Sequence, residues 1–372
     1  MPTPNTLSYF IIPVYEKYIG NLERLFFRRF QMTLSLMQAY KFSTNLKDFK
    51  SSEEFQLNDL FFDEYGLSYD CVLSPSTYLY SLNVAGTSLA CSNIANLYTY
   101  SKKNQNINIP LPIIFNFLGG WHHAQRSSAS GYCYVNDIVI CINDLKKIHT
   151  QILYIDLDLH HCDGVEEAFS DCNTNGTILI ISIHHFSPGF FPGTGQLPQQ
   201  INMTNSKNKF NINIPLKEGI CDTNYFALFK RVIESIYDLN GDQKSSANLP
   251  DVIIIQCGAD VLVGDPHKVF NLTPTSIINC VNFINTHFCQ KLNIPLIILG
   301  GGGYNFADTS RCWVQLVASL SNMTLDNDIP EHTYFPLYGP SYELSITPGL
   351  KKDSNDQAYL NFIVNSIKEQ IK

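Results

Sequence analysis

Six short runs rich in valine, isoleucine and leucine recur along the chain and constrain its fold more than any other feature. They end at Phe117, Leu159, Ile183, Ile214, Cys257 and Leu299. The runs are continuously apolar rather than alternating, which is typical of parallel strands covered by helices on both faces. Helical spacing occupies intervals such as 225–237 and 275–288, so the pattern predicts βαβ repetition. We expect an α/β fold with a central, mostly parallel sheet flanked by helices.

Composition limits the class of protein. A chain of 372 residues with 45% hydrophobic and 16% charged residues can bury a large core. Its formal net charge of -8 gives no footprint for nucleic acid, although an acidic surface suits a basic peptide. The start of the chain has no basic region, and its apolar stretch is interrupted by Pro13 and Glu16, so the eleven cysteines indicate a reducing compartment. No apolar run reaches the roughly 20 residues of a membrane-spanning helix, and we expect a soluble protein.

Polar or glycine-rich clusters stand directly after the expected strands. They read GGWHH, DLHHCDG, HHFSPGFFPGTG, GADVLVGDP and GGGGYN. Ligands in open parallel sheets bind outside the carboxyl ends of the strands. The five clusters are therefore predicted to converge on one active site at that edge.

One of these clusters has the residue types of a metal site. Asp158 and His160 are two residues apart, so on a strand they would project from the same face. Asp260, after another strand, could close a three-ligand site. Two carboxylates and an imidazole suit catalytic zinc or a similar divalent ion. The alternative is that Asp158 caps a turn and His160 is a packed histidine.

The adjacent histidines His122 and His123 need polar partners if they are buried, and Asp156 and Asp163 are available. A carboxylate on one imidazole nitrogen fixes the tautomer and raises basicity, as a general base that activates water requires. The alternative is a pair of hydrogen-bonded structural histidines.

Two further clusters could complete such a site. The run Gly300 to Gly303 allows a tight bend, and the hydroxyl of Tyr304 can donate to a developing oxyanion. A phosphate-binding loop is disfavoured because no Walker lysine follows and the run is not G-x-G-x-x-G. Phe190 and Phe191 are either core residues or the wall of an apolar channel.

From about Arg28 to its C-terminus, the chain resembles the class I zinc-dependent histone deacetylases, most of all the histone deacetylase 8 branch. The resemblance rests on FLGGWHHAQRSSASGYCYVNDIVI, ILYIDLDLHHCDGVEEAF, HHFSPGFFPGTG, QCGADVLVGDP, FNLTP and LGGGGYNFADTSRCW, in the family's order. It implies one catalytic domain over residues 1–372 that removes acetyl groups from lysine side chains.

The resemblance also implies residue roles. Asp158, His160 and Asp260 are the implied ligands of zinc, with ferrous iron as the alternative metal in the cell. His123 is the implied general base and acid, and His122 is its electrostatic neighbour. Asp156 is expected to pair with His122 and Asp163 with His123, while Tyr304 polarises the acetyl carbonyl.

Other implied roles concern the substrate channel and the surroundings of the metal. Tyr132 and Phe191 flank the lysine chain, Gly131 accepts the scissile amide proton, and Asp70 holds the substrate backbone. Arg29 matches an arginine of an internal cavity. A structural potassium ion is also implied, with ligands from Asp156, Asp158, His160, Ser182 and Ile183.

The implied partners are acetylated histone tails in the nucleus. The alternative substrates are a cohesin-type protein, longer acyl-lysines or an acetylpolyamine, and the alternative location is the cytoplasm. We expect no direct binding to nucleic acid or to a membrane. Inositol phosphate-bridged corepressors are not expected, because Phe26, Pro266 and Ala307 stand where such relatives carry basic residues.

This chain departs from the family's pattern at several places. Tyr132 replaces phenylalanine, His267 replaces methionine or leucine at the rim, and Cys162 replaces glycine, which is expected to constrain its turn. The stretch between Tyr40 and Asp70 is short and lacks a histidine-containing helix.

Two other classes of protein compete with this prediction. An inactive scaffold would lack a ligand or base, and none is missing. An arginase-like enzyme with two manganese ions would need a second ligand set, and the aromatic channel motif argues against it.

Overall fold

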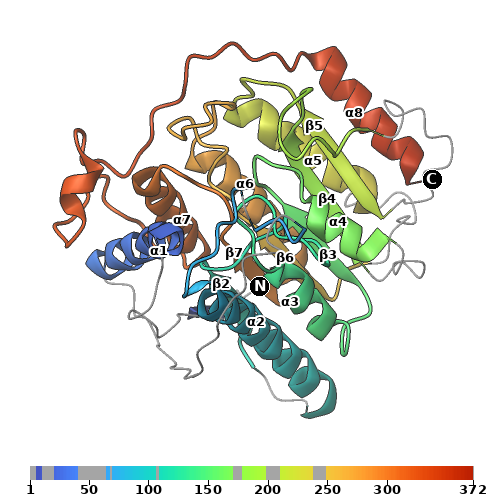
Figure 1. Ribbon diagram of the computed structural model, residues 1–372. Helices are drawn as coiled ribbons and strands as arrows, with labels where there is room; N and C mark the ends of the chain where they lie inside the picture. The colour runs from blue at the N-terminus through green and yellow to red at the C-terminus, as the bar shows by residue number, and fades with distance from the viewer. Residues whose placement is uncertain are drawn as a thin grey trace.

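A computed structural model describes residues 6–10, 21–40, 64–67, 69–105, 109–170, 178–197, 210–237 and 249–371 (Figure 1). Most of the stretch between Tyr40 and Asp70 lies outside the described residues, as does the side chain of Phe26. The predictions made for them are therefore not tested by the structure.

Seven strands form one sheet in the described part of the chain, in the order β1-β2-β7-β6-β3-β4-β5. Every neighbouring pair is parallel. The strands are β1 (Thr6–Phe10), β2 (Leu111–Asn116), β3 (Ile152–Asp156), β4 (Ile178–His185), β5 (Asn211–Leu216), β6 (Val252–Gln256) and β7 (Leu296–Leu299). The predicted α/β class with a mostly parallel sheet is confirmed.

The ends of the strands differ from those predicted. β3 ends at Asp156 rather than Leu159, so Asp158 and His160 lie in the segment after the strand and not on one strand face. The chain bends there because the Asp156 carboxylate accepts the backbone N–H of Asp158 at 3.1 Å. The edge strand β1, paired with β2, was not among the expected strands.

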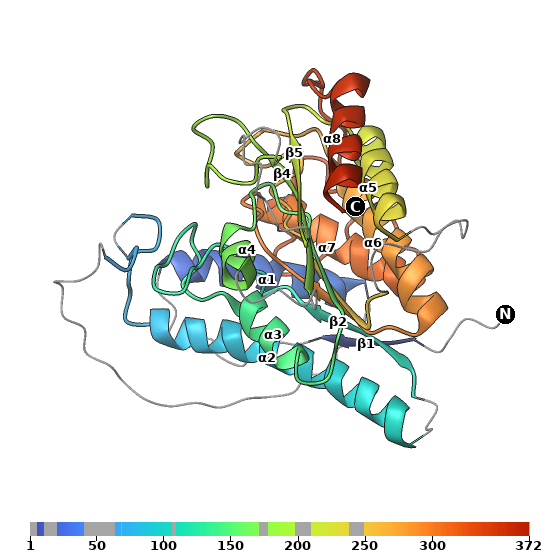
Figure 2. The same ribbon diagram turned by 90° about the vertical axis from the view of Figure 1, so that its right-hand side faces the viewer.

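Helices cover both faces of the sheet (Figure 2). One layer contains α2 (Thr77–Gln105), α3 (Asp137–Leu145) and α4 (Asp163–Ser170). The other contains α1 (Asn21–Ala39), α5 (Asp222–Tyr237), α6 (Pro274–Ile284), α7 (Phe306–Leu320) and α8 (Gln357–Gln370). α6 continues as the π-helix η3 (Asn285–Gln290), and a short 3-10 helix, η4 (Phe335–Tyr338), follows α7. The helices expected at 225–237 and 275–288 are present as α5 and as α6 with η3.

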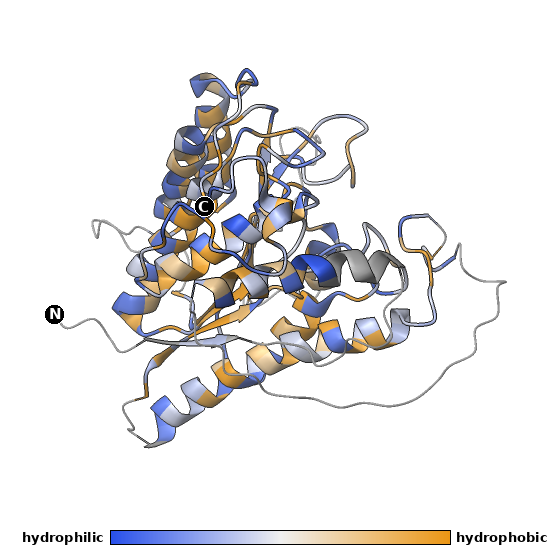
Figure 3. Cartoon of the chain, turned by 90° about the vertical axis from the view of Figure 1, so that its left-hand side faces the viewer, coloured by the Kyte–Doolittle hydropathy of each residue, from blue (hydrophilic) through white to orange (hydrophobic). Residues whose placement is uncertain are grey.

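The continuous apolar runs are explained by two cores, one on each face of the sheet. In β6, Ile253 and Ile255 belong to the core beneath α5, α6 and α7, whereas Val252 and Ile254 belong to the core beneath α2 and α3. Because successive side chains point to opposite faces, every position of such a strand must be apolar. Hydrophobic segments accordingly run through the interior in Figure 3. No helix in the described ranges combines the length and apolarity needed to cross a membrane.

Candidate metal and catalytic site

The candidate site lies beyond the carboxyl ends of β3 and β6, which are neighbours in the sheet. The chain runs from β3 to β4 and β5 on one side, while β6 and β7 lie on the other. Ligand sites of parallel sheets form at such a change of direction. The loops after these strands bring the predicted metal ligands together.

Asp158, His160 and Asp260 each offer one ligand atom, and these atoms lie within 4.8 Å of one another. Nδ1 of His160 is 3.2 Å from Oδ1 of Asp158 and 3.0 Å from Oδ2 of Asp260. All three residues are buried. Burial and the neighbouring Asp158 carboxylate raise the pKa of Asp260 to about 7. Two buried carboxylates held this close are stabilised by a divalent cation, so the donor set fits a metal such as zinc.

The Asp158 carboxylate is held by donors that the sequence analysis missed. Oδ2 accepts hydrogen bonds at 2.8 Å from Nε2 of Gln256 and at 2.8 Å from the backbone N–H of Gly302. Gln256 also donates to the carbonyl of Gly120 at 3.2 Å. Hydrogen bonds of this kind orient a metal ligand. The available signal was a buried polar residue at the end of the apolar run VIIIQ.

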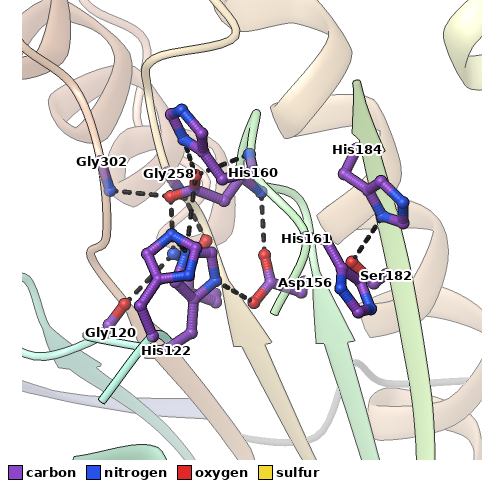
Figure 4. Close-up of polar contacts among 12 residues, drawn as sticks. Gly120, His122, Asp156, His160, His161, Ser182, His184, Gly258 and Gly302 are labelled. Carbon is purple, nitrogen blue, oxygen red and sulfur yellow. Dashed lines mark hydrogen bonds and ion pairs between the residues drawn. The ribbon is translucent and has the colours of Figure 1, made fainter. Parts of the chain in front are cut away.

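The glycine run lies against the carboxylates of the site. A Cβ atom at Gly302 would stand 2.3 Å from Oδ2 of Asp260, so no side chain fits there. Gly301 and Gly303 have φ of 133° and 124°, a conformation that favours glycine. The glycines therefore allow backbone to approach the metal ligands, and Figure 4 shows Gly302 beside this cluster.

The two adjacent histidines form two separate pairs with carboxylates, as predicted. Nδ1 of His122 is 2.8 Å from Oδ2 of Asp156, and Nδ1 of His123 is 2.6 Å from Oδ1 of Asp163. The Nε2 atoms of the two imidazoles are 2.9 Å apart. Tyr154 donates a short hydrogen bond to the same oxygen of Asp156. Both histidines are buried, and the ring centroid of His123 lies 5.8 Å from that of His160. Figure 4 shows His122 beside Asp156.

Electrostatics distinguishes the two histidines. Burial disfavours a charge on His122, but the carboxylates of Asp156 and Asp158 outweigh it and raise its pKa to about 9. Burial and the positive charge of His122 lower the pKa of His123 to about 3. Near neutral pH, His122 is therefore protonated and His123 is neutral and able to accept a proton.

The loop that carries the histidines is fixed by the start of α3. The side chain of Asn136 caps α3 and donates to the carbonyls of His122 and Ala124 at 3.2 and 3.0 Å. The Asp137 carboxylate accepts the backbone N–H of Trp121 at 2.9 Å. The YVND motif thus positions the GGWHH motif.

Tyr304 lies next to two residues at which this chain departs from the family's pattern. Its ring centroid is 5.8 Å from that of Tyr132 and 5.1 Å from that of His267. The Asp265 carboxylate accepts the backbone N–H of Tyr304 at 2.8 Å and lies 2.8 Å from Nδ1 of His267. Burial and the carboxylates of Asp260 and Asp158 raise the pKa of Tyr304, which keeps its hydroxyl protonated.

His267 is an exposed residue that lies beside the metal cluster. Its ring centroid is 5.0 Å from that of the candidate ligand His160. The side chain is one-third exposed, so it faces both the metal cluster and solvent.

The expected substrate-binding residues surround this cluster. The ring of Phe191 is half exposed and lies 4.7 Å from the ring of His123, while Phe190 stacks on His160 at 5.3 Å. The Asp70 carboxylate accepts the backbone N–H of Gly131 at 2.8 Å. Phe191 therefore places an exposed aromatic ring beside His123, where the predicted channel would have one of its walls.

Of the residues predicted for a monovalent cation, Asp158 and His160 belong to the metal cluster, and the other three lie on the neighbouring strands β3 and β4. Asp156 of β3 is paired in register with Ser182 of β4, and Ile183 follows in the same strand. The Ser182 hydroxyl is 2.9 Å from Nδ1 of His184 (Figure 4). This places a carboxylate and a hydroxyl oxygen side by side.

Cys162 does not strain its turn. Its φ is not positive, and its side chain packs in the apolar core beside Val165. Burial raises the pKa of the thiol well above its ordinary value, so it stays protonated. Nor do disulfides form, because every cysteine in the described ranges is a free thiol. The backbone at this position therefore accommodates Cys162 without strain and needs no glycine.

Arg29 connects α1 to the glycine run. Its guanidinium donates to the carbonyls of Gly303 and Gly301, both at 2.8 Å, and lies 4.8 Å from the centroid of the Trp313 ring. It is almost fully buried.

Comparison with known proteins agrees with this geometry. Residues 17–320 match the model of the histone deacetylase domain. The chain is 38% identical to histone deacetylase 8 of Xenopus laevis over 323 residues, which cover 87% of this chain and 90% of that protein. The chain belongs to the histone deacetylase family.

More distant members agree with this placement. Histone deacetylase 1 of Homo sapiens is 38% identical over 260 residues, which cover 70% of this chain and 50% of that protein. Type-1 histone deacetylase 1 of Dictyostelium discoideum is 35% identical over 309 residues, which cover 83% of this chain and 56% of that protein. The predicted membership of class I, on the branch of histone deacetylase 8, is confirmed.

Proposed function

We propose that this histone deacetylase family member is a zinc-dependent hydrolase of acetyl-lysine side chains, with one catalytic domain over residues 1–372. The observation that carries the proposal is the convergence of three buried ligand atoms with a neutral histidine and a tyrosine hydroxyl. Asp158, His160 and Asp260 hold the metal. Zinc supplies Lewis-acid polarisation of the acetyl carbonyl and lowers the pKa of water. Ferrous iron is the alternative occupant.

His123 acts as the general base and then as the general acid. Its Nδ1 is fixed by Asp163, and its neutral Nε2, which lies 2.9 Å from Nε2 of His122, is the atom that takes a proton from the attacking water in this proposal. The same nitrogen then gives the proton to the leaving lysine amine. The positive charge of His122, which Asp156 sustains, stabilises negative charge that develops beside it.

Tyr304 and the channel residues act on the substrate. The Tyr304 hydroxyl donates to the developing oxyanion. Phe191 and Tyr132 flank the lysine chain, and the Gly131 carbonyl accepts the amide proton. Asp70, at the mouth, holds the substrate backbone while its carboxylate fixes Gly131.

Two further groups have structural roles in this proposal. A potassium ion would be held by Asp156, Asp158, His160, Ser182 and Ile183, through oxygen atoms. Oxygen ligands suit such a hard cation. Arg29 holds the glycine run in place.

The proposed substrates are acetylated lysines of histone tails in the nucleus, since the acidic chain suits basic peptides. The alternative substrates are a cohesin-type protein, longer acyl-lysines or an acetylpolyamine, because His267 and Tyr132 make the channel wall more polar. These substrates would be acted on in the nucleus or the cytoplasm. No direct contact with nucleic acid or membrane is proposed. Inositol phosphate and a corepressor are not required.

A panel of acetylated substrates tests this proposal. Purified protein should hydrolyse acetyl-lysine in a histone-tail peptide, and His123→Ala should abolish most of the turnover with metal retained. Preference for acetylpolyamine or a longer acyl chain would favour the alternative, and no turnover of any acylated amine would contradict hydrolysis.

A further inference from the structure

The outer face of α2 carries a continuous stripe that is unusual for a helix on the surface. Its exposed positions follow helical spacing from the second residue of the helix almost to its end. They are Tyr78, Leu82, Gly86, Leu89, Asn93, Leu97 and Tyr100. The five large side chains are between 38% and 65% exposed. A solvent-facing helix surface is normally polar, so this α2 stripe indicates an interaction surface.

The α2 stripe also lacks charge. No residue from Thr77 to Ser101 is charged, and the first basic residues are Lys102 and Lys103 at the C-terminal end. By contrast, the surface helix α5 has an ion pair between Lys230 and Glu234. Covering the α2 stripe therefore removes no charged group from water. Desolvation of charged groups is the main energetic cost of burying a polar surface.

The order of residues along the stripe is nearly the same in both directions from Leu89. Tyr78 and Tyr100 are each eleven residues from it, and Leu82 and Leu97 are seven and eight residues away. A surface that meets its own copy across a two-fold axis must be self-complementary in this manner. Two antiparallel α2 helices would pair Tyr78 with Tyr100 and Leu82 with Leu97, with Leu89 at the axis.

Space at the helix surface agrees with close pairing. In the same register, Gly86 faces Asn93 of the second copy. A Cβ atom built at Gly86 meets nothing within 4 Å, so this position is open outward. A glycine opposite a short polar side chain lets two helices approach to the usual separation of about 8–10 Å.

We propose that the chain forms a two-fold homodimer through antiparallel pairing of the α2 stripe. With about 200 Å² for each fully exposed large side chain, the exposed fractions of these five residues give roughly 500 Å² of apolar surface per copy. Two copies give roughly 1,000 Å², near the lower limit of specific interfaces. The dimer is therefore expected to dissociate at roughly micromolar concentration.

Sedimentation velocity of the full chain with its metal, from about 1 to 100 µM, tests the proposal. Wild type should shift from monomer to dimer, and Leu89→Asp should remain monomeric because two carboxylates would meet at the axis. Phe362→Asp on α8 is the matched control, since Phe362 is exposed to a similar degree but lies outside the stripe. It should dimerise like wild type, and thermal melting of each variant reports its folding.

Charge exchange tests the register independently. Leu82→Lys and Leu97→Glu should each weaken self-association at least tenfold, and an equimolar mixture should recover a heterodimer because lysine then faces glutamate. A monomeric wild type at 100 µM overturns the proposal, whatever else covers the α2 stripe. Dimerisation that survives Leu89→Asp, or a mixture that stays monomeric, overturns the assigned interface.

Discussion

Replacing Tyr304 by phenylalanine removes one hydroxyl and little else. The ring keeps its contacts with Tyr132 and His267, and the backbone N–H keeps its bond to Asp265. Deleting one oxyanion donor costs about 10²- to 10³-fold in turnover, or roughly 2.7–4 kcal/mol of transition-state stabilisation. We expect kcat to fall by this factor with KM nearly unchanged, because the hydroxyl acts mainly on the developing oxyanion.

Tyr132→Phe is the matched control for this variant. It deletes a hydroxyl from a ring only 5.8 Å away, at a wall position to which we assign no part in proton transfer. The assay is steady-state hydrolysis of an acetyl-lysine peptide, with metal content and melting temperature measured on the same samples. Tyr132→Phe should change kcat less than about threefold. An equally small loss in Tyr304→Phe, with metal retained, would refute the role of Tyr304.

Asp260→Asn should lower metal occupancy and turnover together, because it removes one of two anionic ligands; full zinc content with full turnover would exclude it as a ligand. Burial opposes ionisation of Asp144, but hydrogen bonds from Lys147 and Ser92 lower its pKa overall. The ionised Asp144 carboxylate therefore stabilises the fold above its unfolded-state pKa of about 3.9, and this stabilisation is lost as pH falls through its lower folded-state pKa. The melting temperature of Asp144→Asn should consequently decline less than that of wild type between pH 6 and pH 3. Turnover by bacterially produced, dialysed protein should not depend on inositol hexakisphosphate with a corepressor fragment, since Pro266 and Ala307 offer no phosphate ligands; activity only when both are added would contradict this.

The sequence was sufficient to predict the sheet, because strands buried on both faces leave continuous apolar runs. It was not sufficient for β1, since Thr6–Phe10 is short and its place depends on pairing with β2, about a hundred residues away. The convergence of Asp158, His160 and Asp260 was predicted, but for the wrong local reason. Asp158 and His160 converge through a bend after β3, whose hydrogen bonds involve side chains and cannot be read from residue spacing.

Residues that support the site were harder to predict than those that form it. Gln256 is one polar residue in an apolar run, and nothing in the run indicates that it reaches Asp158 and Gly120. The closeness of His267 to His160 likewise follows from the fold of the loop around Asp265. Whether Cys162 fits its turn depends on the backbone φ, which is not positive there and which the residue type alone does not reveal.

Stoichiometric metal reconstitution tests the central proposal most directly. Metal-stripped protein is titrated with zinc, and bound metal and turnover of an acetyl-lysine peptide are measured on the same samples. One set of ligands at Asp158, His160 and Asp260 predicts that turnover rises in proportion to bound zinc and reaches its maximum at one equivalent. Turnover that requires two bound metals, or none at all with one equivalent bound, would contradict a single-zinc deacetylase.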